Sequence, residues 1–360
     1  MNFVLLFVLC MQPFSYALMR SVFWLGKNKF SRLAKYLIGI SIFAISNGLL
    51  LVSFLRLNHL AFRLTAAWMI FLLYCLFAAL ATYVLYRLLR SRMPSALLSR
   101  LLRVFAPVFV AILFVFSWYN AYTPVIKHYQ ITLNKPLAKP LRIGMVADLH
   151  LGSLVGKRQL DKLADIMNAQ KVDIILMPGD IMDDDTQAYE AEKMQPHLQK
   201  LRAPLGVYAT LGNHDLFGAE QAIVAALQDA GIRVLYDEAA SINGQFSIIG
   251  RPDDLDKNRL PSAELLHQVD TQKPVILLDH RPTEITQHAD LPIDIQLSGH
   301  VHNGQVFPAN LLVRFLNRVH YGYEQINQTH FFVTSGYGFW GVPFRLGSQA
   351  EVMIIDVKGK

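Results

Sequence analysis

The stretch LRIGMVADLH, residues 141–150, decides the fold of the C-terminal part of this chain. Its apolar run at 141–147 is typical of a buried strand. The stretch KRQLDKLADIMNAQ at 157–170 places its apolar residues on one helix face, and the apolar run at 172–177 is typical of a second buried strand. Two buried strands on either side of one helix predict a βαβ unit.

The same alternation continues to the end of the chain. Further helices are expected near 186–200 and 218–230, and further strands at 206–211 and near 232–236, 246–250, 274–279, 293–298, 329–334 and 351–357. The stretch 123–140, with its three prolines, joins this part to the preceding one and could add an edge strand. We therefore predict an α/β domain over 124–360, with two sheets packed between helices and a partly antiparallel late section.

The N-terminal part has a different composition. The whole chain is 53% hydrophobic, and no Asp or Glu occurs before Asp148. Residues 1–140 carry 15 Lys and Arg, so the two parts have net charges of about +15 and −8. A basic, acid-free, apolar part followed by an acidic part indicates a membrane region and then a water-soluble domain. The negative charge of that domain argues against a nucleic-acid partner.

Four stretches within 1–123 are long enough to cross about 30 Å of hydrocarbon, which takes about 20 residues each. They lie at about 3–25, 36–55, 66–86 and 104–122, and we predict four transmembrane helices. The first is the weakest, because it contains Pro13 and Arg20. A cleaved signal peptide is the alternative for that stretch, but it begins without basic residues and more apolar segments follow it.

Basic residues are unevenly distributed among the loops between these segments. The first-to-second loop has four and the third-to-fourth has five, whereas the second-to-third has only Arg56 and Arg63. By the positive-inside rule, the two strongly basic loops are cytoplasmic. We therefore expect a multi-pass cell (inner) membrane protein with an extracytoplasmic C-terminal domain. No span contains an acidic residue, so we expect an anchor rather than a proton or cation pathway.

Short polar motifs follow five of the expected strands. They are ADLH (Asp148, His150), PGDIMD (Asp180, Asp183), LGNHD (Asn213, His214, Asp215), LLDHRP (His280) and SGHVH (His300, His302). In open α/β sheets, functional groups gather at the carboxyl ends of strands. Each motif alone has an ordinary explanation, such as a helix N-cap, a polar turn or a packed histidine.

The five motifs together point to a metal site. Ten His, Asp and Asn side chains beside apolar strands are costly to bury unless their charges are paired or bound to metal. The only cysteines, Cys10 and Cys75, lie in the N-terminal apolar runs, so no thiolate is available to the soluble domain. Imidazole, carboxylate and amide ligands without thiolate suit Mn, Fe or Zn.

The ordered motifs D-x-H, G-D-x-x-D, G-N-H-D, H and G-H-x-H resemble those of the calcineurin-like metallophosphoesterase family. The resemblance covers about 142–357 and implies that family's two-sheet sandwich flanked by helices. HRP after the fourth motif, NGQ after the fifth and the tail SGYGFWGVPFRLGSQAEV resemble a bacterial, membrane-associated branch similar to UDP-2,3-diacylglucosamine hydrolases. That branch usually has G-H-T-H-G-G-Q, whereas this chain has Val301 and Asn303; neither is an expected ligand.

The resemblance implies two divalent metal ions. One would be held by Asp148, His150, Asp180 and His302, and the other by Asp180, Asn213, His280 and His300. Asp180 would bridge them, and a water between the ions would lose a proton and attack phosphorus. His214 is the expected acid that assists the leaving oxygen.

Four further residues are expected around this centre. Asp183 and Asp215 would orient ligand histidines. Arg251 and Arg281 would pair with a phosphate, the alternatives being surface solvation and a loop salt bridge.

The late aromatic residues invite a lipid-binding interpretation. Phe331 and Phe332 lie in an expected core strand, whereas Phe339 and Trp340 lie in a glycine-rich loop where they could face lipid.

We therefore predict a membrane-anchored, dinuclear metal-dependent phosphoesterase. Its partners would be the lipid bilayer and a phosphorylated small molecule or lipid, with a lipid or envelope precursor as the substrate. The alternative is a membrane sensor or transport subunit whose phosphoesterase-like domain only binds a ligand. Degenerate ligand positions would favour that alternative, and none of the expected positions is degenerate.

Overall fold

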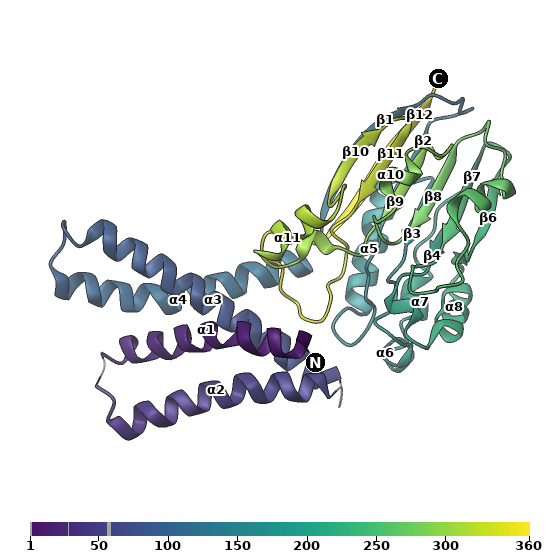
Figure 1. Ribbon diagram of the computed structural model, residues 1–360. Coiled ribbons are helices and arrows are strands. Elements are labelled where there is room, and N and C mark those ends of the chain that lie inside the picture. Colours follow the sequence, from purple (N-terminus) through teal and green to yellow (C-terminus); the bar gives the residue numbers. More distant parts are fainter. Residues whose placement is uncertain (1, 28, 56–58) are drawn as a thin grey trace. The chain divides into compact units, whose positions relative to one another are not determined.

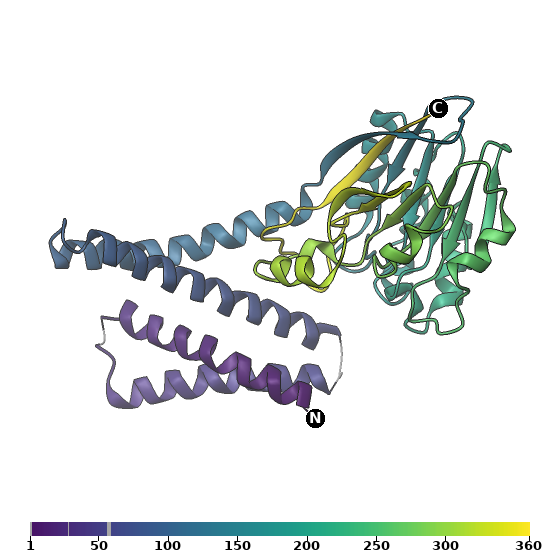
Figure 2. The ribbon, with the colours of Figure 1, turned by 45° about the horizontal axis from the view of Figure 1, so that its top comes forward.

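The computed structural model describes residues 2–27, 29–55 and 59–360. The chain divides into two compact units, Met1–Phe116 and Ser117–Lys360. The first unit holds the helices α1 (Asn2–Leu25), α2 (Arg32–Phe54), α3 (His59–Leu89) and most of α4 (Ser95–Tyr122). The last turns of α4 belong to the second unit and lead into its first strand (Figures 1 and 2).

Three helices in the described part of the chain are long and apolar enough to cross a membrane. They are Arg32–Phe54, Leu60–Leu89 and Ser95–Tyr122. Within the described residues, three of the four predicted spans are thus confirmed, and α1 is not among them. Pro13 and Arg20, which made this stretch the weakest predicted span, both lie inside α1.

Polar side chains of α1 are instead satisfied by its neighbouring helices. Gln12 Nε2 donates to Asn47 Oδ1 at 3.0 Å, and Ser15 Oγ donates to Ser46 Oγ at 2.9 Å. Trp68 Nε1 from α3 also donates to Ser46 Oγ, at 2.9 Å. Such hydrogen bonds stabilise helix packing where water is absent.

The second unit is built on two mixed six-stranded sheets (Figure 1), as predicted. The first has the order β1 (Val125–Leu133), β12 (Glu351–Gly359), β2 (Leu141–Met145), β3 (Ile174–Pro178), β4 (Val207–Thr210) and β5 (Arg233–Val234). The second has the order β10 (Gly322–Ile326), β11 (Thr329–Val333), β9 (Ile295–Ser298), β8 (Val275–Asp279), β7 (Phe246–Arg251) and β6 (Glu238–Ile242). The stretch after Tyr122 does supply an edge strand, β1.

Helices and short 3₁₀ turns connect the strands. They are α5 (Lys157–Gln170), α6 (Gln187–Ala191), α7 (Gln195–Leu198), η1 (His214–Leu216), α8 (Glu220–Asp229), α9 (Ser262–Leu265), η2 (Leu266–Gln268), α10 (Ile285–His288), η3 (His302–Gly304) and α11 (Ala309–Leu316). The single helix expected near 186–200 is two short ones. Lys193 lies between them with a φ of 52°. An α-helix does not contain this backbone conformation.

Two apolar layers hold the sheets in place. In β3, Ile174 and Leu176 face a cluster shared by both sheets, whereas Ile175 and Met177 face a cluster that includes α5. Successive residues of a strand point to opposite faces, so a strand covered on both sides must be apolar throughout. The same stacking brings the strand ends of both sheets to one region.

Candidate metal centre

The five polar motifs meet at the carboxyl ends of parallel strands. β2, β3 and β4 are parallel in the first sheet, and β8 and β9 are parallel in the second. The loops after them carry Asp148 and His150, Asp180 and Asp183, Asn213 and His214, His280, and His300 and His302, in that strand order. Residues that are up to 154 positions apart in the sequence are thereby gathered into one cluster.

The backbone is strongly bent at the predicted ligands. Asp148, His150, Asp180, His300 and His302 all have φ values between 46° and 70°. Non-glycine residues rarely adopt this left-handed conformation, which costs about 1–3 kcal/mol at each position. Such strain persists only where the surrounding structure enforces it, and it concentrates at functional sites.

Two glycines allow the loops to approach the carboxylates closely. A Cβ atom on Gly212 would lie 2.1 Å from Asp180 Oδ1, and one on Gly299 would lie 2.3 Å from Asp148 Oδ2. Any side chain at either position would therefore displace a predicted ligand. Glycine at both positions keeps the approach to the carboxylates uncrowded.

Asp148, His150 and His302 form the first group of the cluster, with one ligand atom of each within 4.8 Å of the others. The Nε2 atoms of His150 and His302 lie 3.1 Å apart, and His302 Nε2 lies 3.6 Å from Asp148 Oδ1. All three side chains are buried, and burial raises the pKa of Asp148.

Asp180, His280 and His300 form the second group. His280 Nδ1 donates to the carbonyl oxygen of Pro178 at 2.8 Å, so its Nε2 is turned toward Asp180, with 3.1 Å to Oδ2. Burial by itself lowers the pKa of His280, but the charge of Asp180 outweighs it and raises the pKa to about 10. This position therefore favours a positive charge. Asn213 Oδ1 joins the group at 2.8 Å from His300 Nδ1.

The residues present fit a pair of divalent ions. Among the described buried side-chain atoms, Asp148 Oδ2, His150 Nδ1 and His280 Nε2 make no hydrogen bond. Buried polar atoms without partners are costly, and a bound cation would satisfy the carboxylate and imidazole atoms that face the cluster. Asp180 Oδ2 lies 3.8 Å from His150 Nε2 and 3.1 Å from His280 Nε2, within reach of both groups.

His214 stands beside the cluster and is held by two carboxylates. Its backbone N–H donates to Asp180 Oδ1 at 2.8 Å, and its Nδ1 donates to Asp184 Oδ1 at 2.5 Å. Burial lowers the pKa of His214, but the hydrogen bond to Asp184 and the nearby carboxylate charges raise it overall. Asp184 was not predicted. Its only signal in the sequence was the run of three aspartates, Asp183–Asp185. The family pattern includes only Asp183 of these.

Asp183 and Asp215 have different surroundings. Asp183 Oδ1 lies 3.7 Å from His150 Nδ1, too far for a hydrogen bond, so its role in orienting that histidine stays a prediction. The expectation that Asp215 orients a histidine needs correction, because its carboxylate accepts from the backbone N–H groups of Ile181, Met182 and Gly212. Asp215 therefore ties together the two loops that carry Asp180 and Asn213.

Arg251 does not face the cluster as a phosphate-binding residue should. It is buried, and its guanidinium donates to Asp279 Oδ2 at 3.2 Å, to Glu284 and to the carbonyl oxygen of Leu260. The prediction for Arg251 is therefore wrong, because its charge is already neutralised inside the domain.

Arg281 is placed differently from Arg251. It is partly exposed, and its Nε donates to Asp253 Oδ2 at 2.6 Å. The pKa of His300 is lowered by burial, by the charge of His280 and by the charge of Arg281. Arg281 therefore lies near the cluster.

A fully buried arginine behind the cluster was missed. Arg345 Nη2 donates to His302 Nδ1 at 3.1 Å and to the carbonyl oxygens of Ser335 and Gly338, both at 2.7 Å. It connects the late glycine-rich loop to a predicted ligand. Arg345 belongs to the tail that the family resemblance covers, but nothing in the local pattern distinguishes it from a surface arginine.

The late aromatic residues differ in their exposure to solvent. Phe331 and Phe332 are fully buried in β11, as expected. Phe339 is also buried, so its expected exposure to lipid is wrong, whereas Trp340 is 48% exposed.

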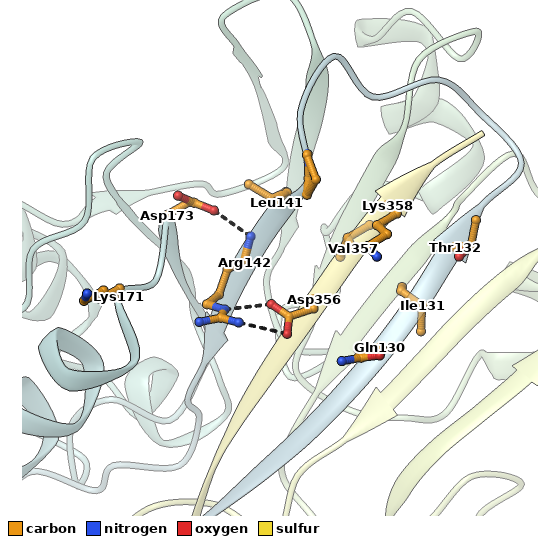
Figure 3. A pocket seen from close by; sticks show the side chains of 11 residues that line it. Gln130, Ile131, Thr132, Leu141, Arg142, Lys171, Asp173, Asp356, Val357 and Lys358 are labelled. Carbon is orange, nitrogen blue, oxygen red and sulfur yellow. Dashed lines mark hydrogen bonds and ion pairs between the residues drawn. The ribbon is translucent and has the colours of Figure 1, made fainter.

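A surface pocket of about 650 Å³ opens at the opposite edge of the first sheet (Figure 3). Three of its charged residues interact: Arg142 binds Asp356 at 2.7 Å, and Asp173 accepts from the Arg142 backbone N–H at 2.7 Å. The pocket contains no residue of the polar cluster. The predicted chemistry therefore belongs to the other edge.

Comparison with known proteins agrees with this geometry. The family model described as calcineurin-like phosphoesterase matches residues 141–304, which include every predicted metal ligand. A protein named "Uncharacterized metallophosphoesterase" from Aquifex aeolicus is 32% identical over 263 residues, which cover 70% of this chain and 99% of that protein. The chain belongs to the calcineurin-like metallophosphoesterase family. This membership confirms the predicted resemblance to the family.

Other members of the family are longer than the shared region. A Helicobacter pylori protein with the same printed name is 31% identical over 243 residues, 66% of this chain and 65% of that protein. A Danio rerio protein, named "Transmembrane protein with metallophosphoesterase domain", is 30% identical over 274 residues, 71% of this chain and 62% of that protein. The chain thus spans about 65% of the length of the Helicobacter pylori relative. The narrower resemblance to UDP-2,3-diacylglucosamine hydrolases stays a prediction.

Proposed function

We propose that this protein is a membrane-anchored, dinuclear metal-dependent phosphoesterase that hydrolyses a phosphoester or pyrophosphate bond, with a lipid or envelope precursor as its substrate. The observation that carries the proposal is the position of Asp180 between the two ligand groups, within 4 Å of His150 and of His280. One carboxylate within reach of both groups is what a bridged pair of ions requires.

When bound, the two ions supply Lewis acidity and a water of lowered pKa. Asp148, His150 and His302 would hold one ion together with Asp180, and Asn213, His280 and His300 would complete the other site. These residues also fix the position of the bound phosphate relative to the rest of the domain.

His214 would act on the leaving oxygen. Asp184 accepts a hydrogen bond from Nδ1 of His214 and so fixes the orientation of the ring. Nε2 of His214 is then left to donate a proton to the leaving oxygen. Arg281, which is partly exposed, would bind the phosphate oxygens while its Nε stays paired with Asp253. The alternative function, a domain that only binds a ligand, gains no support, because all seven predicted ligand positions carry a ligand-type residue.

We also propose that the C-terminal domain lies outside the cytoplasm. The loops before α2 and between α3 and α4 are the strongly basic ones, and the assignment needs only the three apolar helices α2, α3 and α4. An alkaline phosphatase reporter fused after Lys360 should therefore be active. An inactive reporter, together with an active β-galactosidase fusion at the same position, would reverse this orientation and redirect the search for substrates.

The activity itself is tested with the full chain purified in detergent. After removal of metal and addition of Mn²⁺, it should hydrolyse p-nitrophenyl phosphate or its bis ester. A comparison of nucleotide-linked, lipid-linked and simple phosphoesters then identifies the substrate class. Inactivity with Mn²⁺, Fe²⁺ and Zn²⁺ on all of these substrates would count against the proposal.

A further inference from the structure

Helix α11 presents its apolar residues to the outside. None of its residues is buried, and Leu311, Leu312, Phe315 and Leu316 are 56%, 57%, 87% and 66% exposed. At 100° per residue these four side chains lie within one sector of the helix. A helix on the surface of a water-soluble domain turns such a sector toward the core.

Two neighbouring aromatic residues extend this apolar surface. Phe307 and Trp340 are 39% and 48% exposed. Gln305 joins their segments, because its Nε2 donates to the carbonyl oxygen of Trp340 at 3.0 Å and its Oε1 accepts from the Trp340 backbone N–H at 2.9 Å. We call the residues Phe307, Leu311, Leu312, Phe315, Leu316 and Trp340 the apolar rim.

The apolar rim is connected by hydrogen bonds to the end of a candidate membrane span. The Phe307 backbone N–H donates to the carbonyl oxygen of Leu346 at 2.6 Å, and that of the adjacent Arg345 donates to Ser117 at 2.9 Å. Ser117 and Asn120, whose Nδ2 donates to Arg345, belong to the last turns of α4. Figures 1 and 2 show α11 at the same end of the second unit as these turns.

The end of α4 has the character of a membrane interface. The apolar helix Ser95–Tyr122 closes with Trp118 and Tyr119, which are 53% and 52% exposed. Amphipathic aromatic rings favour the headgroup level of a bilayer. Few residues separate these rings from the apolar rim along the hydrogen-bonded path within the second unit.

The charge of the surrounding segment suits anionic lipid. The segment from Asn303 to Tyr323 contains no Asp or Glu. Its basic residues are Arg314, Arg318 and His320. Arg314 lies on α11 itself, and Arg318 pairs with Glu324 at 2.5 Å on the exposed surface. Basic residues beside an exposed apolar face are typical of helices that lie in the bilayer interface.

We propose that the apolar rim is an interfacial element that enters the headgroup region of the bilayer spanned by the chain's own helices. The insertion orients the second unit, because α11 begins seven residues after the predicted ligand His302. It brings the metal centre to the lipid surface, where the phosphate of an amphiphilic molecule lies. The docking itself does not depend on the proposed catalytic activity.

The test uses the full chain in vesicles of phosphatidylcholine and phosphatidylglycerol. Cys10 and Cys75 are the only cysteines, so replacing both by Ser allows a single fluorescent label at Phe315→Cys. The matched control is Asp270→Cys. Asp270 is exposed and lies in the loop before β8, at the opposite end of that strand from His280. An environment-sensitive label at 315 should show blue-shifted emission and quenching by lipids with brominated chains, whereas the label at 270 should be quenched by aqueous iodide.

Two results would overturn the proposal. One is equal quenching by iodide at 315 and 270, with no quenching by brominated lipid at 315. The other is protection of the label at 315 from iodide only when the vesicles are crowded with protein. That result would indicate that a second copy of the chain, and not lipid, covers the apolar rim. Leu312→Cys provides a second labelling position if Phe315→Cys fails to fold, and unchanged thermal unfolding of the labelled chains verifies their structure.

Discussion

The Nε2 atoms of His150 and His302 lie 3.1 Å apart, although 152 positions separate the two residues in the chain. Two imidazole nitrogens at this distance cannot both present lone pairs or both present protons without repulsion. Without an ion, one ring donates a hydrogen bond to the other; a shared cation would instead accept a lone pair from each nitrogen. The first and last polar motifs of the domain thus form one site.

The bridging position of Asp180 predicts the effect of its removal. Asp180→Ala should abolish phosphoesterase activity and reduce the content of both metal ions, because each ion would lose a carboxylate ligand. Metal content after gel filtration, measured by mass spectrometry, tests this prediction. The control Asp270→Asn changes an exposed carboxylate and should leave both quantities unchanged. Retention of both ions in Asp180→Ala would refute the bridge.

The contact between His214 and Asp184 predicts a separation of catalysis from metal binding. His214→Ala should lower kcat by about 10²- to 10⁴-fold, the usual contribution of a general acid, with metal content unchanged. Asp184→Asn should lower kcat less, because it affects only the orientation of the ring. The matched control is Asp185→Asn, whose carboxylate accepts only a local backbone N–H within the described contacts. Loss of metal in His214→Ala would show that the residue is a ligand instead.

Arg251 should matter for stability and not for the substrate. Arg251→Met leaves the fully buried Asp279 with one cationic partner fewer, and breaking a buried ion pair costs about 3 kcal/mol or more. Thermal unfolding should shift to lower temperature, with KM of the folded enzyme unchanged. Arg233→Met breaks an exposed pair with Glu238 and should cost less than about 1 kcal/mol. A higher KM at normal stability would restore the phosphate-binding role.

Asp215 should act through the loops that it joins. In Asp215→Asn the amide nitrogen replaces one carboxylate oxygen, so a donor faces the backbone N–H of Gly212 or Met182. An unsatisfied buried donor costs about 1–3 kcal/mol. We expect a lower unfolding temperature in the metal-free protein as well as weaker metal binding. An effect on metal affinity without any loss of stability would contradict this structural role.

The apolar rim predicts a difference between two kinds of substrate. The double variant Leu312→Glu and Phe315→Glu places two charges on the exposed face of α11. If both the proposed activity and the docking hold, hydrolysis of a bilayer-embedded phosphoester should fall, whereas hydrolysis of p-nitrophenyl phosphate should not change. Comparison of kcat/KM for the two substrates in the same vesicles measures this difference. Equal losses on both substrates would speak against a role in docking.

Much of the fold followed from local patterns. The apolar strands β2, β3 and β8, the helix α5 and the apolar helices α2 to α4 all have strong periodicity or length, which short-range forces impose. The strands β6 and β10 were missed because both are hairpin arms with exposed positions, and β10 alternates buried and exposed residues over only five positions. Helix α11 was missed because it has only eight residues, too few for its one-sided apolar pattern to stand out in the sequence.

The sequence alone determined the residue types of the metal centre and their order along the chain. Asp148, Asp180 and His300 each follow an apolar run that predicts a strand, and the chemistry of their side chains limits what they can bind. Only the tertiary structure decided the partners of each group: Asp184 for His214, Asp279 for Arg251, Arg345 for His302. The physical reason is that ligand chemistry belongs to single side chains, whereas hydrogen bonds and ion pairs depend on the packing of loops far apart in the sequence.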